Sequence, residues 1–132
     1  MNFRIPLICA AVAAVLGAGA TQAASGPAGD PVKGKAMFTQ QCMLCHSTVA
    51  GQEGAAPSLN GIVGRKAAAE VGFPAYSRAL KASGLTWTPP NLDKFLSGPA
   101  KLVPGTNMPI TLARPEDRAN VISYLASLKA TH

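Results

Sequence analysis

The segment Cys42-Met43-Leu44-Cys45-His46 constrains this chain more than any other feature. Two cysteines separated by two residues and followed directly by a histidine form the attachment motif of a c-type haem. Each thiol can add across one vinyl group of the ring, and the imidazole can then ligate the iron. Cys-x-x-Cys alone also suits a redox disulfide or half of a zinc site. The histidine that follows favours covalent haem, so we expect the rest of the chain to enclose a haem ring.

Residues 1–23 have the layout of a cleaved signal peptide. Arg4 provides a basic start, residues 5–19 are apolar and uncharged, and small residues occupy most of 20–24. This order matches the basic, apolar and cleavage regions of a secretory signal. The apolar run is shorter than the roughly 20 residues that span a bilayer as a helix. We therefore expect cleavage after Ala23, with Ala20 or Ala24 as alternative positions. Export to the periplasm, a flexible lead over 24–29 and one domain over 30–132 would follow.

Charge and cysteine content limit the kinds of partner and the means of stabilisation. The chain has a net charge of +6, and a basic surface attracts nucleic acid, anionic lipid or an acidic protein face. Export and the lack of a Gly-rich phosphate loop argue against nucleic acid. Once Cys9 is removed with the signal peptide, the only thiols are those of the attachment motif. A disulfide framework is therefore excluded, and the haem is expected to supplement the small core and its folding free energy.

The first and last helices are the most strongly indicated elements. Asp30-Pro31 combines an N-cap residue with proline at the first helical position, which predicts a helix over 31–41. In it, Val32 and Phe38 fall on a shared apolar side. Gly34 costs about 1 kcal/mol relative to alanine in a helix, which indicates close packing against another helix. Pro115 marks the start of the last predicted helix. The apolar stripe of this helix comprises Val121, Ile122, Leu125 and Leu128.

The middle of the domain carries weaker signals. Short helices are predicted over 75–82 and 91–96, and Pro99 is expected to end the second of these. Pro104 and Pro109 restrict the backbone between them, so we expect an extended loop over 101–110. No stretch shows sustained alternation of apolar and polar residues, so no sheet is predicted. The sequence thus supports an all-α domain.

The residue opposite His46 on the iron decides what the haem can do. His132 is at the C-terminus, where residues are usually solvated. Met37 has the spacing of a core residue, and Met43 lies inside the motif, from which it cannot reach the far face. Met108 stands in the proline-bracketed loop, and Met/His is a known pair of haem ligands. Two protein ligands leave no open position for oxygen or peroxide, so such a haem exchanges single electrons.

Taken together, these features resemble those of class I cytochromes c, close to the mitochondrial type and the bacterial cytochromes c2. The resemblance covers nearly the whole domain and rests on the attachment motif, the Gly34 and Phe38 pair, the Tyr124-Leu125 ending and the segments 57–65, 72–77, 85–87 and 104–108. It implies the cytochrome c fold: about five short helices wrapped around one covalently attached haem c, with the N-terminal and C-terminal helices crossing.

The resemblance also implies roles for individual residues. Cys42 and Cys45 would form the thioether bonds, and His46 and Met108 would be the axial ligands of the iron. The carbonyl of Pro57 would accept a hydrogen bond from the imidazole. The residues that would hold the haem propionates are Arg65, Tyr76, Trp87 and Thr106. Without the resemblance, the two aromatic residues of that set would be read as ordinary core residues.

Several positions depart from the mitochondrial pattern. Phe95 replaces a tyrosine near the methionine ligand and Leu80 replaces an asparagine, so the methionine side is expected to be drier. Ile110 replaces an aromatic residue and Asn107 replaces a lysine beside the exposed haem edge, so the docking face is only partly reproduced. The lysines that remain candidates for steering an acidic partner, each also explicable as a solvated surface residue, are Lys35, Lys66, Lys81, Lys94 and Lys101.

The expected function is electron transfer in a respiratory chain by a soluble, monomeric periplasmic protein that does not bind nucleic acid. It would make transient contacts at the membrane surface with a cytochrome bc1-type donor and with a terminal oxidase or photosynthetic reaction centre as acceptor. Three alternatives stay open: a cytochrome subunit of a periplasmic dehydrogenase, a haem peroxidase, and a thiol-disulfide oxidoreductase using Cys42 and Cys45. The last of these predicts a strand before the motif, where Asp30-Pro31 predicts a helix.

Overall fold

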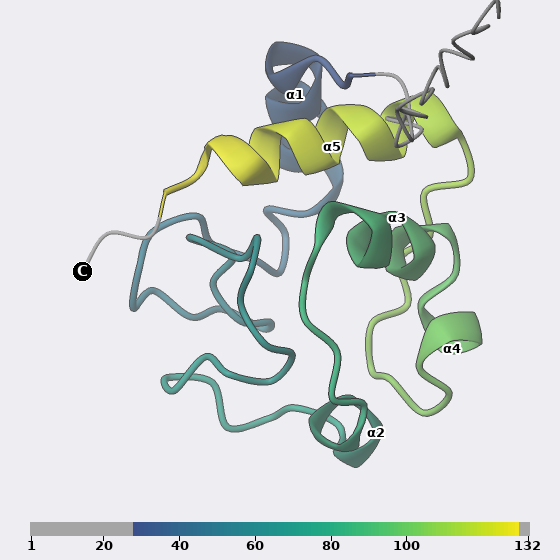
Figure 1. Cartoon of the computed structure of the whole chain (residues 1–132). Coiled ribbons are helices and arrows are strands. Elements are labelled where there is room, and N and C mark those ends of the chain that lie inside the picture. Colours follow the sequence, from purple (N-terminus) through teal and green to yellow (C-terminus); the bar gives the residue numbers. More distant parts are fainter. Residues whose placement is uncertain (1–27, 130–132) are drawn as a thin grey trace, which may run out of the picture.

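The computed structural model of the chain describes residues 28–129. Within this range it contains five helices, which are α1 (Pro31–Gln41), α2 (Arg78–Ala82), α3 (Pro89–Ser97), α4 (Pro99–Leu102) and α5 (Pro115–Ser127) (Figure 1). The only pairing of β type among these residues is one isolated bridge between Lys66 and Thr86. The all-α prediction is therefore confirmed. The predicted signal peptide over 1–23, most of the predicted lead over 24–29 and His132 lie outside the described residues.

None of the helices between residues 28 and 129 is both long enough and apolar enough to cross a membrane.

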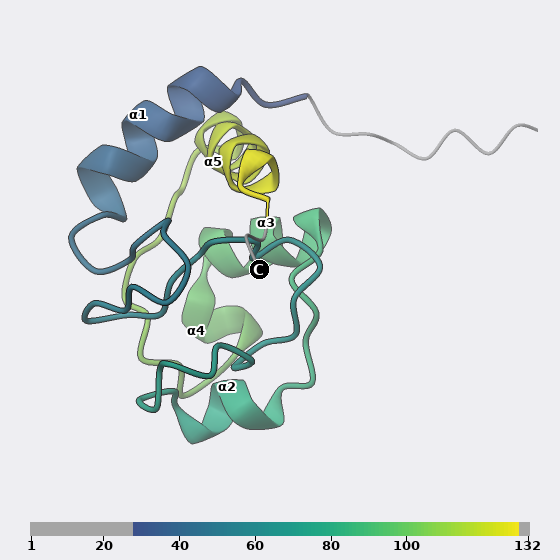
Figure 2. The ribbon, with the colours of Figure 1, turned by 90° about the vertical axis from the view of Figure 1, so that its left-hand side faces the viewer.

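Helices α1 and α5 cross at one end of the molecule, as predicted for the two terminal helices (Figures 1 and 2). A Cβ atom at Gly34 would lie 2.0 Å from the carbonyl oxygen of Asn120, so only glycine permits this approach. Phe38 is fully buried, and its ring packs at a tilt against Tyr124 with 5.4 Å between ring centroids. The backbone N–H of Asp30 donates to Oδ1 of Asn120 at 2.8 Å. The close packing predicted from the glycine is confirmed.

Helix α1 starts where the sequence predicts, but fewer of its residues are buried than predicted. Asp30 Oδ1 accepts hydrogen bonds from the backbone N–H groups of Val32 and Lys33 at 2.8 and 3.2 Å. The side chain of Val32 is 77% exposed, whereas Gly34 and Phe38 are the buried residues of the helix. Residues four apart share a helix face, while a residue two positions away lies on the opposite side. The expected shared apolar side of Val32 and Phe38 is therefore wrong.

Helix α2 is shorter than the predicted segment 75–82. It begins at Arg78 because Ser77 caps it, with Oγ accepting from the backbone N–H of Leu80 at 3.1 Å. The three residues before it, 75–77, lie outside any helix and line a cavity, and Ser77 has an extended backbone conformation.

Helices α3 and α4 also differ from their prediction. Thr88 caps α3, so the helix starts at Pro89 and is longer than the predicted 91–96. Pro99 ends α3 as expected, but it also occupies the first position of α4, where a proline loses no hydrogen bond. The predicted loop over 101–110 therefore begins only after Leu102.

A buried arginine anchors the loop that leads into α5. Arg118 donates from Nε to Oδ1 of Asp93 on α3 at 2.7 Å. Its Nη1 donates to the carbonyl oxygens of Leu112 and Ala113 at 2.9 and 2.8 Å. The backbone N–H of Leu112 donates in turn to the carbonyl oxygen of Leu96 at 2.8 Å. This end of the loop is thus fixed to both α3 and α5, by a residue that the sequence alone did not single out.

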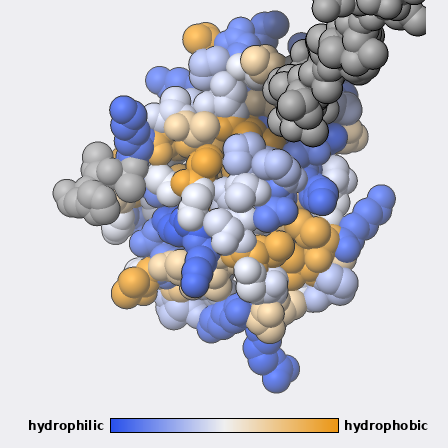
Figure 3. Space-filling view, in the orientation of Figure 1, coloured by the Kyte–Doolittle hydropathy of each residue, from blue (hydrophilic) through white to orange (hydrophobic). Residues whose placement is uncertain are grey.

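The apolar core lies between α1, α3, α5 and the long loop that follows α1. Its buried members include Phe38, Trp87, Phe95, Val121 and Leu125. On the face shown in Figure 3, hydrophilic side chains project at many points, with apolar patches between them. In Figure 1 the loops between residues 42 and 77 lie to the left of and below α3. Residues from these loops and from α3 line the same cavity.

Candidate haem site

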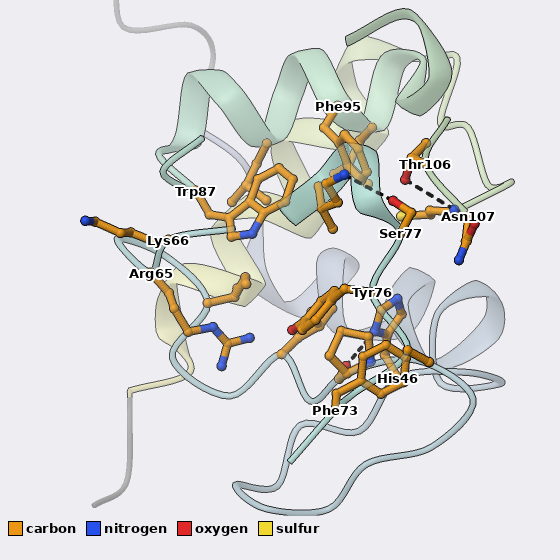
Figure 4. A pocket seen from close by; sticks show the side chains of 18 of the residues that line it. His46, Arg65, Lys66, Phe73, Tyr76, Ser77, Trp87, Phe95, Thr106 and Asn107 are labelled. Atoms are coloured by element: carbon orange, nitrogen blue, oxygen red, sulfur yellow. Dashed lines mark hydrogen bonds between the residues drawn. The ribbon is translucent and has the colours of Figure 1, made fainter. Parts of the chain in front are cut away.

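An apolar cavity opens among the loop after α1, helices α2 and α3, and the loop before α5 (Figure 4). Seven of the predicted site residues line it, namely His46, Pro57, Arg65, Tyr76, Trp87, Thr106 and Met108. Phe95 and Leu80, the two positions expected to make the methionine side drier, also line it. Neither cysteine of the motif is part of the cavity wall. Cys42 is half-buried against the core, and Cys45 is exposed.

The attachment motif forms a tight turn at the end of α1. The backbone N–H groups of Cys45 and His46 both donate to the carbonyl oxygen of Cys42, at 3.1 and 2.9 Å. Both thiols are free. Burial, and to a lesser degree the neighbouring Cys45, raises the pKa of the Cys42 thiol. A redox dithiol normally has a lowered thiol pKa and, in the thioredoxin arrangement, follows a strand. The motif here follows a helix, which disfavours the oxidoreductase alternative.

His46 is oriented by a backbone carbonyl. Its Nδ1 lies 2.7 Å from the carbonyl oxygen of Pro57. Because a carbonyl can only accept, Nδ1 carries the proton, and Nε2 is left as the nitrogen available to a metal. Burial lowers the pKa of the imidazole, against smaller opposing effects of the Pro57 carbonyl and of Glu53. The neutral form that results is the one that ligates metals.

Met108 is the only methionine of the described residues that lines the cavity. Met43 is 57% exposed, and Met37 packs against the core from α1. The backbone N–H of Met108 donates to Oγ1 of Thr106 at 3.4 Å, which fixes the turn of the loop. His46 and Met108 therefore reach the same cavity from the loop after α1 and the loop before α5.

Arg65 lies at the cavity, and the donor group at its Nε is buried without a partner in the described structure. Its Nη2 donates to the carbonyl oxygen of Ser58 at 2.6 Å, and its Nη1 donates to the carbonyl oxygen of Asn60 and to the carboxylate of Glu70. Its Nε is buried and has no acceptor among residues 28–129. An unpaired buried donor costs about 1–3 kcal/mol. A carboxylate in the cavity would satisfy it, so the site fits a ligand with acidic groups.

Tyr76 and Trp87 are held by aromatic contacts beside this arginine. The ring of Tyr76 packs edge-on against Phe73 at 5.0 Å, and Trp87 packs edge-on against Phe95 at 4.9 Å between centroids. The backbone N–H of Trp87 donates to the carbonyl oxygen of Arg65 at 2.8 Å, which brings the two residues together. Burial is the largest effect on Tyr76 and raises the pKa of its hydroxyl. The phenol therefore stays protonated and can donate a hydrogen bond.

The sequence alone did not assign two carboxylates and one hydroxyl at this site. Glu70 binds Arg65, and Ser77 lines the cavity beside Tyr76. Glu53 accepts from the backbone N–H of Ser58 at 2.6 Å through Oε2, while its buried Oε1 has no partner in the described structure. The segment 72–77 belongs to the family pattern, and this signal points to Ser77. No local signal marks either glutamate.

Comparisons with known proteins agree with this geometry. The family model for cytochrome c matches residues 31–129. The cytochrome c2 of Rhodopila globiformis is 45% identical over 106 residues, which are 80% of this chain and 99% of the relative. The cytochrome c2 of Rhodomicrobium vannielii is 46% identical over 117 residues, which are 86% of this chain and 92% of the relative.

Solved structures of the same kind match the fold. Cytochrome cH from Methylobacterium extorquens superposes with a TM-score of 0.69 at 39% identity, over 75% of this chain and 99% of that one. The structure of cytochrome c2 from Rhodospirillum centenum gives a TM-score of 0.72 at 30% identity, over 77% of this chain and 100% of that one. The crossing helices, the cavity and the attachment turn are thus those of a known family. The chain belongs to the class I cytochromes c, which are mono-haem electron carriers with a covalently attached c-type haem and not enzymes.

Proposed function

We propose that Cys42 and Cys45 bind the haem through thioether bonds and that His46 and Met108 are the axial ligands of its iron. One observation carries this assignment: an oriented imidazole and a thioether reach the same apolar cavity beside the attachment turn. The haem supplies a centre that gains and loses one electron. The chain holds it in place, closes both axial positions and excludes water with apolar walls.

The propionate end of the haem would lie at Arg65. The unused, buried Nε of this arginine supports this placement, since it offers a donor to an acidic group in the cavity. The protonated hydroxyl of Tyr76 offers a second donor, and Trp87 and Thr106 line the same cavity. The hydrogen bond between Pro57 and His46 fixes the plane of the imidazole and raises its basicity as a ligand.

The chain would work as a soluble, monomeric carrier in the periplasm. The segment 1–23, with the pattern of a cleaved signal peptide, and the similarity to cytochromes c2 support export. A cytochrome bc1-type complex is the proposed donor, and a terminal oxidase or photosynthetic reaction centre is the proposed acceptor. Its contacts with them would be small and short-lived, as is usual for redox encounters.

The ligand assignment is tested with the holoprotein and a Met108→Ala variant. We expect covalent haem on a denaturing gel and a low-spin spectrum with the iron–thioether charge-transfer band in the oxidised wild type. The variant should lose this band and gain peroxidase activity, because one axial position becomes open. A variant that keeps the band would contradict the assignment of Met108. Strong peroxidase activity in the wild type would likewise contradict it, because the iron would then already have an open position.

The separate question of a lasting partner is tested by size-exclusion chromatography of native extract. A carrier should elute at the size of the monomer. Elution together with a larger protein would favour the dehydrogenase subunit.

A further inference from the structure

The two segments that carry the proposed iron ligands are almost free of charge. Residues 36–64 contain one charged side chain, that of Glu53, and residues 102–113 contain none. The carboxylate of Glu53 points inward, since one oxygen accepts from Ser58 and the other is buried. Neither segment therefore presents a full charge to solvent. The chain has a net charge of +6, so its charged side chains are unevenly distributed along the sequence.

The two segments face the same side of the molecule. His46 and Ala55 from the first segment line the cavity together with Asn107 from the second. The backbone N–H of Ala56 donates to the carbonyl oxygen of Cys45 at 3.0 Å, which folds the first segment back onto the attachment turn. In Figure 2 the loop after α1 and the loop before α5 both run along the left-hand side.

Exposed apolar side chains are found on these segments. Leu44 is 83% exposed, Met43 57% and Ile110 40%. Large apolar side chains at this level of exposure gain free energy when a contact removes them from water. We use the term neutral face for the surface that comprises Met43, Leu44, Ala55, Asn107 and Ile110.

The cations of the described residues all lie outside the two segments. The exposed ones are Lys33, Lys35, Lys66, Arg78, Lys81, Lys94, Lys101, Arg114 and Lys129. Figure 4 shows Lys66 beside Arg65 at one end of the cavity and Asn107 toward the other. Lys35 precedes Cys42 by two helical turns, a rise of about 10 Å. Arg114 is paired with Glu116 and Asp117. No positive charge is thus contributed by either of the two segments that carry the neutral face.

We propose that this cytochrome meets its redox partners through the neutral face and that the partner presents an apolar, uncharged surface. The proposal rests on the proposed function, because it places the electron's exit at the cysteines and Met108. A charged partner group would lose water at this face without gaining an ion pair, which costs free energy. An apolar partner surface would instead bury Leu44, Met43 and Ile110. Steering by the lysines would then contribute little at the point of contact.

Electron self-exchange between two copies of the holoprotein tests the proposal, since a second copy presents an apolar, uncharged face. One electron passes from the reduced copy to the oxidised copy, so the two species exchange with no net reaction, and magnetisation transfer between their NMR signals gives the rate. The variants are Leu44→Lys and Leu44→Glu. The matched controls, Ala126→Lys and Ala126→Glu, place the same charges on an exposed position of α5. Visible spectra confirm that each variant keeps its haem ligands.

Leu44→Lys and Leu44→Glu should each exchange electrons more slowly than the Ala126 variant that carries the same charge. A charge of either sign disturbs a neutral, apolar contact. We expect about tenfold slowing at an ionic strength of about 0.01 M, where charges act over about 30 Å. The slowing should shrink as salt is added. A Leu44→Glu variant that exchanges faster than its control would overturn the proposal, since flanking cations would then dominate the contact.

Washed membranes of the producing organism provide the second probe. The rate at which they oxidise the reduced wild type should change little with salt, and both Leu44 variants should react more slowly. A rate that falls steeply with salt, together with a Leu44→Lys variant that reacts normally, would overturn the proposal in favour of an acidic partner. Membranes that do not react at all would contradict the proposed partners, while self-exchange would still decide the nature of the face.

Discussion

The crossing of α1 with α5 and the loops around the cavity are stabilised in different ways. At the crossing, Gly34 brings two backbones into contact and Phe38 is fully buried against Tyr124. Around the cavity, the loops leave two buried polar atoms without partners among residues 28–129, Oε1 of Glu53 and Nε of Arg65. The crossing is completed by the chain's own side chains. The loops would depend on the haem to fill the space between them and to accept a hydrogen bond from Nε of Arg65.

This difference predicts different consequences for substitutions in the two regions. A change at the crossing should alter the stability of the whole domain with little effect on the spectrum or the reduction potential. A change at the cavity should alter the properties of the haem as well. A core this small also gains folding free energy from the bound group, so the crossing is not expected to survive alone.

The largest effect is expected from removing haem attachment. A variant with Cys42→Ser, Cys45→Ser and His46→Ala should be largely unfolded, because the loops would surround an empty apolar cavity. Far-ultraviolet circular dichroism measures the loss of helicity. Full native helicity in this variant would show that the chain folds without the haem and would remove the contrast between the two regions.

Substitution at the crossing should come next. Gly34→Ala places a Cβ atom 2.0 Å from the carbonyl oxygen of Asn120, so the helices must move apart. We expect a loss of about 3 kcal/mol in the free energy of unfolding, as for a strongly overpacked core. Urea denaturation of the holoprotein measures it. Ala36→Gly, at an exposed position of the same helix, is the control and should cost about 1 kcal/mol. Equal losses in the two variants would contradict the close contact.

Substitution of Arg65 is expected to lower the stability less than Gly34→Ala does, and also to change the reduction potential of the haem. Arg65→Gln removes the donors to Ser58 and the partner of Glu70, with a cost of about 1–3 kcal/mol. It also removes a positive charge near the propionates, so the ferric state becomes relatively more stable and the reduction potential should fall. Redox titration measures the potential, with Lys94→Gln, an exposed residue of α3, as the control. An unchanged potential would place the haem carboxylates away from Arg65.

The smallest effect is a pH dependence from Tyr76. Burial raises the pKa of its hydroxyl above the usual value of about 10. The unfolded chain therefore releases this proton at a lower pH than the folded protein does. The contribution of the Tyr76 hydroxyl to the free energy of unfolding is therefore fully present below a pH of about 10, and it is lost as the pH rises further. Urea midpoints of the wild type and Tyr76→Phe at rising pH check this. A variant with the same alkaline decline as the wild type would contradict it.

Elements with local signals could be predicted from the sequence. The starts of α1 and α5 follow from proline at the first helical position, and at α1 also from the Asp30 cap. The attachment motif and Met108 could be proposed as site residues from the sequence because few residue types can fill their roles. The close approach at Gly34 was inferred from its cost within a helix. In each case the residue type and its neighbours in the chain contained the information.

Features that depend on contacts between distant segments could not be predicted in this way. The exposure of Val32 follows from which side of α1 meets α5, and sequence spacing allowed either side. The start of α4 was missed because a proline that ends one helix can also open the next. The roles of Arg118, Glu70 and Glu53 come from loops that meet only in the folded chain.

The anchoring of the loop before α5 by Arg118 has a consequence for motion. Leu112 and Ala113 are tied to α5 through this buried side chain, and Leu112 is also bonded to Leu96 of α3 through its backbone. Among residues 28–129, the hydrogen bonds of the segment 104–110 are those of the turn at Thr106. Local opening proceeds first where hydrogen bonds are few. If this loop opens to withdraw Met108 from the cavity, we expect it to swing about Leu112 as a hinge. Arg118 would then set how far the thioether can travel without unfolding the helix that follows.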